Sequence, residues 1–332
     1  MKTAAFWHRE ESGTIHCELC PHHCKLKEGQ TGLCGVRTVE GGELKAAAYG
    51  LISSAHVDPI EKKPLYHFYP GTEIFSIGGW GCNFACAFCQ NWTISQRVVP
   101  SSTRYEPARV IEEATGSGCP AIAYTYNEPL VGLEFVLDCA RLAKEAGLAN
   151  VLVTNGYVEP GPAAQILPLT AALNVDIKST QEDFYRQQCR GRLAPVLAFC
   201  RQAVAAGCHV EITNLVIPTL NDAPAQFEEL AKWIRDNLGE KTPLHLSAYR
   251  PEYKLEIAPT PPELLVKAYE TCRAVLPYVY MGNVATKGGQ NTACPGCGHE
   301  WIVRRGYRTS VRGLKGGACG QCGRAADVIL RR

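Results

Sequence analysis

The chain has 332 residues, enough for one large domain with small appendages or for two ordinary domains, and its 46% of hydrophobic residues excludes wholesale disorder. Lys plus Arg number 34 and Asp plus Glu 32, and the resulting net charge of +2 argues against a dedicated DNA-wrapping protein. No apolar run approaches the length of a membrane span, and residues 1–9 lack the apolar core of a signal peptide. We therefore expect a soluble, cytoplasmic protein with no membrane partner.

Cysteine is the unusual residue, with 17 copies, of which 11 fall into three tight clusters within 17–34, 82–89 and 294–322. Both a disulfide framework and metal ligation produce such clusters. The spacing and the lack of a secretory signal favour metal or iron–sulfur ligation. The remaining six are isolated, and we expect them to be small buried hydrophobic side chains: Cys119, Cys139, Cys189, Cys200, Cys208 and Cys272.

The first cluster lies in a polar, glycine-dotted stretch without sustained helical or strand periodicity. We assign residues 1–48 to a Cys-rich N-terminal metal-binding module. Its ligands would be Cys17, Cys20, Cys24 and Cys34, with three histidines close by. Zinc and an iron–sulfur cluster both fit this set, and the spacing narrowly favours zinc.

From residue 73 onward, short apolar runs alternate with longer amphipathic segments. Strands are predicted at 73–77, 121–126, 150–154, 173–178, 210–216 and 244–248. Helices are predicted at 107–115, 133–146, 163–169, 194–206 and 225–237, with Gly147 and Gly207 as C-caps. This alternation implies an α/β protein with a parallel sheet, either part of a barrel or an open doubly wound sheet.

In both architectures the chemistry gathers at the carboxyl ends of the strands. Polar or reactive residues follow or occupy every predicted strand, and these are Cys82, Asn127 and Glu128, Asn155, Lys178, Asn214, and His245. Such a coincidence across six units is difficult to obtain from packing alone. It predicts a functional site at this edge of the sheet.

The central cysteines, Cys82, Cys86 and Cys89, form a C-x3-C-x2-C loop opened by several glycines. Three thiolates this close can bind one iron–sulfur cluster, and a four-iron cubane then keeps one iron open, which is typical of a reactive site. The alternative is a zinc site completed by a distant histidine. The position directly after the first strand of a βα series favours the cluster.

This loop resembles the signature of the radical S-adenosylmethionine (radical SAM) superfamily. Residues 81–92 and 58–68 resemble the branch related to pyruvate formate-lyase activating enzymes. Within that branch the chain is most similar to the radical SAM enzyme of the AmmeMemoRadiSam system, which segments 124–129, 216–222 and 247–251 fit in order. The resemblance implies a partial (β/α)6 TIM-like barrel, to which we assign residues 49–286.

The resemblance also implies a mechanism. In the superfamily the three cysteines hold a [4Fe-4S] cluster whose open iron is chelated by SAM. One-electron reduction cleaves SAM to methionine and a 5′-deoxyadenosyl radical, which abstracts hydrogen from a substrate. Cys82, Cys86 and Cys89 are therefore the expected catalytic, cluster-bearing residues.

Roles at individual positions follow from the same resemblance. Glu128 would bind the SAM ammonium, although Tyr126 and Asn127 replace two glycines of the relatives, and a first-turn helix acid is the structural alternative. Lys178 would pair with the SAM carboxylate, although a solvated lysine would look the same. The other expected cofactor contacts are Thr154, Asn155, Asp176, Asn214, the backbone of Phe88, and His245, for which a core histidine is the alternative.

The third cluster contains two C-x2-C-G knuckles formed by Cys294, Cys297, Cys319 and Cys322. Four thiolates in this pattern are typical of a zinc ribbon, which we place at 287–332 with a hairpin at 301–311. A rubredoxin-like iron site and an auxiliary iron–sulfur cluster are the alternatives. The tail is basic, through Arg304, Arg305, Arg308, Arg312 and Lys315, yet the net charge favours a protein-docking surface over a nucleic-acid contact.

The sequence thus predicts an oxidoreductase-type radical SAM enzyme, similar to glycyl-radical activating enzymes, that acts on a protein or peptide. Its cofactors would be [4Fe-4S], SAM and Zn²⁺. Its partners would be a low-potential donor such as flavodoxin or ferredoxin and, by resemblance, proteins of the AmmeMemoRadiSam system. The alternatives are a radical methyl- or alkyltransferase and a metal-loaded module that binds RNA or protein.

Overall fold

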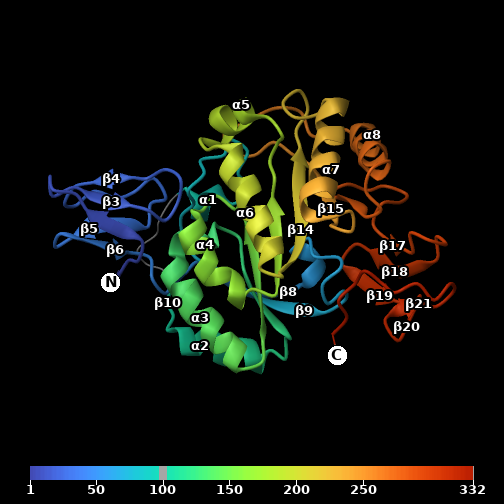
Figure 1. Ribbon diagram of the computed structural model, residues 1–332, viewed down its shortest axis with the longest axis horizontal. Coiled ribbons are helices and arrows are strands. Elements are labelled where there is room, and N and C mark those ends of the chain that lie inside the picture. The colour runs from blue at the N-terminus through green and yellow to red at the C-terminus, as the bar shows by residue number, and fades with distance from the viewer. Residues whose placement is uncertain (97–102, 332) are drawn as a thin grey trace.

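The computed structural model describes residues 1–96 and 103–331. A central α/β body carries a small N-terminal module at one end of the long axis and a small C-terminal module at the other (Figure 1). Among the described residues, the helices are all too short or too polar to cross a bilayer.

The central body is built on one eight-stranded sheet with the order β16-β15-β14-β13-β12-β11-β9-β8. Seven strands run parallel, and β8 joins the edge by pairing antiparallel with β9. The strands are β8 (Ser54–Pro59), β9 (Glu73–Gly78), β11 (Ala121–Tyr124), β12 (Ala149–Thr154), β13 (Ala172–Asp176), β14 (His209–Val216), β15 (Leu244–Ala248) and β16 (Val279–Gly282).

Helices connect the parallel strands, as the alternating sequence pattern predicts. They are α1 (Trp92–Ser95), α2 (Pro107–Gly116), α3 (Leu133–Glu145), α4 (Pro160–Ile166), α5 (Glu182–Phe184), α6 (Leu193–Ala205), α7 (Pro224–Leu238) and α8 (Pro262–Arg273). Four of them begin with proline within the first turn, where the missing amide donor costs nothing. Gly147 and Gly207 follow α3 and α6 with φ of 75° and 81°, so both helix C-caps are where they were predicted.

All six predicted strands are present in the central sheet. This sheet contains two further strands, β8 and β16, that the sequence pattern did not predict. β8 escaped notice because its residues carry charge and a proline, and β16 because its apolar run is short. The edge strands β8 and β16 do not pair with each other within the described parts of the chain, and the partial (β/α)6 barrel stays a prediction.

The N-terminal module consists of two small three-stranded antiparallel sheets. The first contains β2 (Trp7–Arg9), β3 (Ile15–Cys17) and β4 (Lys25–Leu26), and the second β1 (Lys2–Thr3), β5 (Arg37–Glu40) and β6 (Glu43–Ala46). Arg37 donates to Glu134 of α3 at 2.6 Å, and both side chains are buried. This ion pair fixes the module to the central body. A two-stranded pair, β7 (Leu51–Ile52) with β10 (Thr103–Arg104), lies where the chain leaves the module.

The C-terminal module contains β17 (Thr292–Ala293), β18 (Glu300–Arg305), β19 (Arg308–Val311), β20 (Leu314–Lys315) and β21 (Ala318–Cys319). The hairpin of β18 and β19 confirms the one predicted at 301–311. Arg304 corrects an expectation: it is not part of a basic surface, because it is 3% exposed and donates to the carbonyl of Tyr66 at 2.7 Å. It therefore docks the module onto the central body.

Candidate functional site

The cysteine loop begins at the carboxyl end of β9 and is held by several segments. The amides of Ala85 and Ala87 donate to the carbonyls of Cys189 and Gln188, both at 2.9 Å. Lys254 donates its main-chain amide to Ala87 at 2.9 Å from the opposite direction. These contacts fix the loop from segments that follow β13 and β15, so it is a rigid part of the fold.

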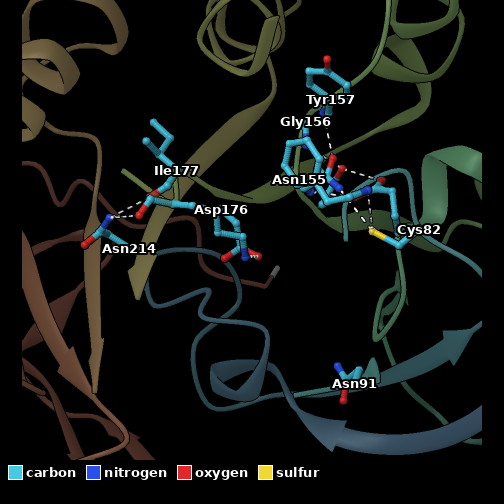
Figure 2. Close-up of polar contacts among 12 residues, drawn as sticks. Cys82, Asn91, Asn155, Gly156, Tyr157, Asp176, Ile177 and Asn214 are labelled. Carbon is cyan, nitrogen blue, oxygen red and sulfur yellow. Dashed lines mark hydrogen bonds and ion pairs between the residues drawn. The ribbon is translucent and has the colours of Figure 1, made fainter. Parts of the chain in front are cut away.

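Cys82 receives two hydrogen bonds on its sulfur. The amide of Phe84 donates at 3.3 Å, and the side-chain amide of Asn155 donates at 3.6 Å (Figure 2). The Asn155 side chain also donates to Asn83 Oδ1 and accepts the amide of Tyr157. Donors aimed at a sulfur stabilise a thiolate, which is the form that ligates metal.

Glu128 joins the carboxyl ends of β11 and β12. Its carboxylate accepts the Thr154 hydroxyl at 2.7 Å, the Asn155 amide at 2.7 Å and the Leu130 amide at 3.0 Å. Burial of the carboxylate raises the pKa of Glu128 to about 7, against the opposing effect of these three donors. The bond from Leu130 makes Glu128 the N-cap of a short 3₁₀ helix, Pro129–Gly132. Glu128 therefore has a structural role at a helix start, which is compatible with a role in cofactor binding.

Lys178 follows β13 and points toward the same area. Its ammonium donates to Asp176 Oδ2 at 2.6 Å. Burial of the ammonium lowers its pKa, but the negative charges of Asp176 and of the Cys86 sulfur outweigh this effect, so the pKa of Lys178 is raised. The site therefore holds a permanent cation next to the cysteine loop.

Asn214 supports this arrangement from β14. Its side-chain amide donates to the carbonyls of Ile177 at 2.8 Å and Lys178 at 3.2 Å (Figure 2). Asn221, just beyond this strand in the segment 216–222, donates to the same Lys178 carbonyl at 2.7 Å. Both amides hold the backbone that carries Lys178.

Cys82, Cys86 and Cys89 offer three thiolates from one loop. Their sulfur atoms are not as closely gathered as those of the C-terminal cysteines, which all lie within 4.8 Å of one another. Ligands of a cubane cluster go to different irons, which sets the sulfurs farther apart.

Cys189 is buried, as expected of the isolated cysteines, and it also lies next to the loop. It is fully buried in the π-helical turn Tyr185–Cys189, and its thiol is in hydrogen-bond contact with that of Cys86. No sequence signal marks it, because the contact depends on how this turn packs against the loop.

His245 has the contacts of a core histidine, which is the alternative stated for it above. It is the second residue of β15, and its Nε2 lies 2.7 Å from the fully buried Glu211 carboxylate. The ring of Tyr66 stands edge-on to it. The expected cofactor contact of His245 stays a prediction.

Phe88 and Asn127 stabilise the conformation of the loop. Phe88 is buried and packs against Phe184, 5.8 Å between ring centres. Asn127, noted in the sequence only by its position, donates to the carbonyls of Trp80 and Gly81, both at 3.0 Å, and accepts the amide of Gly79. It thus fixes the backbone immediately before Cys82.

The C-terminal cysteines form a compact tetrad. Cys294 Sγ lies 3.6 Å from Cys322 Sγ, and Cys297 Sγ lies 3.7 Å from Cys319 Sγ. Sulfurs at about 2.3 Å from one tetrahedral ion stand about 3.8 Å apart. The tetrad therefore has the dimensions of a single-ion site.

Comparison with known proteins finds a family model that matches the part of the chain containing the cysteine loop. The model of the radical SAM superfamily matches residues 77–234. An uncharacterised protein of Methanocaldococcus jannaschii is 42% identical over 99% of this chain and all of its own length. A pyruvate formate-lyase-activating enzyme of Clostridium pasteurianum is 25% identical over 47% of this chain and 67% of its own.

One solved structure supports the fold. A radical SAM methyltransferase from Sphaerobacter thermophilus superposes with a TM-score of 0.52 at 19% identity, over 67% of this chain and 68% of its own. At this level of identity the similarity concerns the α/β fold alone.

Proposed function

The chain belongs to the radical SAM superfamily, and we propose that it reductively cleaves SAM in order to abstract hydrogen from a protein or peptide. The observation that carries the proposal is the contact between Asn155 and Cys82. Through it the residues expected to hold SAM are joined to those expected to hold the cluster.

Radical SAM proteins use SAM and a [4Fe-4S] cluster, and the cluster, when bound, supplies the electron that splits SAM into methionine and a 5′-deoxyadenosyl radical. In this proposal Cys82, Cys86 and Cys89 ligate three irons and leave the fourth open for SAM. The donors on Cys82 Sγ favour its thiolate.

The remaining residues orient SAM. Lys178, held by Asp176, presents its charge to the SAM carboxylate, and Glu128 attracts the ammonium group. Thr154 and Asn155 are the proposed ribose contacts, and the backbone at Phe88 is the proposed adenine contact. Asn214 is a positioning residue in this arrangement, because its side-chain amide donates to the carbonyls of Ile177 and Lys178.

The activating-enzyme relative supports, at 25% identity, a protein glycine or another peptide position as the hydrogen donor. The proposal also includes flavodoxin or ferredoxin as electron donor, proteins of the AmmeMemoRadiSam system as partners, and zinc on the C-terminal tetrad. The module that carries the tetrad is attached to the central body by Arg304. The proposed role of the tetrad is therefore to complete the fold or to dock a partner.

The product of SAM tests this proposal. The full chain, reconstituted anaerobically with iron and sulfide, is incubated with SAM and dithionite, and the nucleosides are separated by chromatography. The proposal predicts 5′-deoxyadenosine and none from Cys89→Ala. S-adenosylhomocysteine or methylthioadenosine instead would establish a methyl- or alkyltransferase, and the absence of all three would contradict enzymatic use of SAM.

A further inference from the structure

The four N-terminal cysteines gather in the interior of their module. Cys17, Cys20 and Cys34 are 6%, 8% and 9% exposed, and Cys24 is half-buried. The main-chain amide of Cys17 donates to the carbonyl of Cys24 at 2.9 Å. Three buried thiols and one half-buried thiol on short strands and loops thus form a candidate ligand set.

Their sulfur spacing differs from that of the C-terminal tetrad. In the tetrad all four sulfurs lie within 4.8 Å of one another, whereas no three of the described N-terminal cysteines do. One zinc ion requires its four sulfurs at tetrahedral distances. A cubane requires them farther apart, because each binds a different iron. The N-terminal sulfurs are therefore set farther apart than those of the tetrad, as the ligands of a cluster would be.

A buried arginine next to this set has two nitrogen atoms without a hydrogen-bond acceptor. Arg37 follows Cys34 by three residues, and it interacts electrostatically with Cys17 and Cys34. Its Nη2 is bonded to Glu134 and Ala5, but its Nε and Nη1 are buried without a hydrogen-bond partner. Thiolates and bridging sulfides of a bound cluster would supply the missing acceptors.

The module touches the radical SAM loop on both sides of Cys82. A Cβ at Gly81 would sit 2.3 Å from the carbonyl oxygen of Cys34, so only glycine allows this approach. His22, which lies between Cys20 and Cys24 in sequence, has its Nε2 2.7 Å from the carbonyl oxygen of Asn83. Both of these contacts start at a cysteine or between two of them and end next to Cys82.

We propose that Cys17, Cys20, Cys24 and Cys34 hold a second [4Fe-4S] cluster, which passes electrons to the cluster on Cys82, Cys86 and Cys89. A low-potential one-electron protein donor is oxidised as the N-terminal cluster is reduced by one electron. The same electron then moves to the radical SAM cluster, with no proton or bond exchanged. The relay rests on the proposed function, whereas the cluster itself does not.

The first experiment identifies the metal independently of SAM chemistry. The triple variant Cys82→Ala/Cys86→Ala/Cys89→Ala of the full chain is reconstituted anaerobically, and its iron, sulfide and zinc are measured with the electron paramagnetic resonance (EPR) spectrum of the dithionite-reduced protein. About four irons and four sulfides per chain, with a reduced-cluster signal, are expected. Zinc in the N-terminal set and no iron would overturn the proposal.

The second experiment tests the relay. Reduction of the radical SAM cluster by flavodoxin is followed by EPR in the wild type, in Cys20→Ser/Cys24→Ser and in His22→Leu, which keeps all four cysteines. Cys208→Ser serves as control, because its hydroxyl can keep the bond to the Leu167 carbonyl. Photoreduced deazaflavin, a small donor, reports whether each radical SAM cluster is intact.

The double variant is expected to slow reduction by flavodoxin at least tenfold, and His22→Leu several-fold, while deazaflavin reduces all four proteins equally. Equal rates with flavodoxin in all proteins would overturn the relay. Failure of the proposed function would look different: both clusters would be reduced normally, and SAM would remain uncleaved.

Discussion

The side-chain amide of Asn155 donates to the sulfur of Cys82 at 3.6 Å, while the main-chain amide of Asn155 donates to Glu128 at 2.7 Å. Asn155 is thus bonded at once to the cysteine loop after β9 and to the carboxylate after β11. Thr154 donates to the same carboxylate, so the three segments share one hydrogen-bond network. SAM bound at the strand ends and a cluster bound on Cys82 would be held by one hydrogen-bond network.

Glu128 predicts a pH dependence of SAM binding. Burial raises its pKa to about 7, so the carboxylate is mostly protonated near pH 6 and mostly charged near pH 8. The ammonium of SAM attracts only the charged form. We expect affinity, measured by anaerobic calorimetry, to rise across this range in the wild type and to stay nearly flat in Glu128→Gln. The same slope in both proteins would contradict an ammonium contact.

Lys178 predicts a loss of affinity without loss of the cluster. Replacing it by methionine removes the cation that Asp176 holds at 2.6 Å, and a lost charge-assisted contact of about 1.4 kcal/mol corresponds to tenfold weaker SAM binding. Iron content is expected to be unchanged. Lys232→Met, at an exposed pair with Glu228, is the matched control, for which affinity should not change. Equal affinities in both variants would leave Lys178 without a role in binding.

A substitution of Cys189 tests whether the cluster keeps one iron open or has a fourth cysteine ligand. Its thiol contacts Cys86, so a fourth cysteine is available beside the three of the motif. Because the proposal requires one iron to be open for SAM, Cys189→Ser should retain the full iron content and the spectral response to SAM. Loss of about one iron per cluster, or a cluster that responds to SAM only after this substitution, would show that Cys189 is a ligand.

Arg304 predicts how firmly the C-terminal module is attached. Its guanidinium is buried 3.8 Å from the equally buried Glu61 carboxylate and lies 4.0 Å from the centre of the Tyr66 ring. Arg304→Met leaves Glu61 without its cation, which is expected to cost about 3 kcal/mol of the free energy of unfolding. Thermal melts of Arg304→Met and of the exposed control Arg305→Met measure this. Identical midpoints would refute the buried ion pair.

Much of the central body could be predicted from sequence because its signals are local. Apolar runs separated by amphipathic segments gave the six βα units, and glycines after α3 and α6 gave their ends. β8 could not be found in this way. It is recruited to the sheet edge by antiparallel pairing with β9, which depends on the neighbouring strand rather than on its own composition.

The site was predictable where residue type follows strand ends, and not where packing decides. Cys82, Glu128 and Asn155 lie together because parallel strands bring their carboxyl ends to one edge. The contact of His245 with the buried Glu211 carboxylate joins two neighbouring strands, and no local pattern reports it. The contacts of Cys189 with Cys86 and of His22 with Asn83 join segments far apart in sequence, and no local pattern reports them.

The most direct measurement is the EPR spectrum of the dithionite-reduced full chain with and without SAM, compared with that of Cys86→Ala. If SAM binds the open iron of a cluster on Cys82, Cys86 and Cys89, its addition will change the signal of the wild type. In Cys86→Ala the SAM-dependent change will be absent, and any remaining signal will be indifferent to SAM. A wild-type spectrum that SAM does not alter would contradict the proposed function.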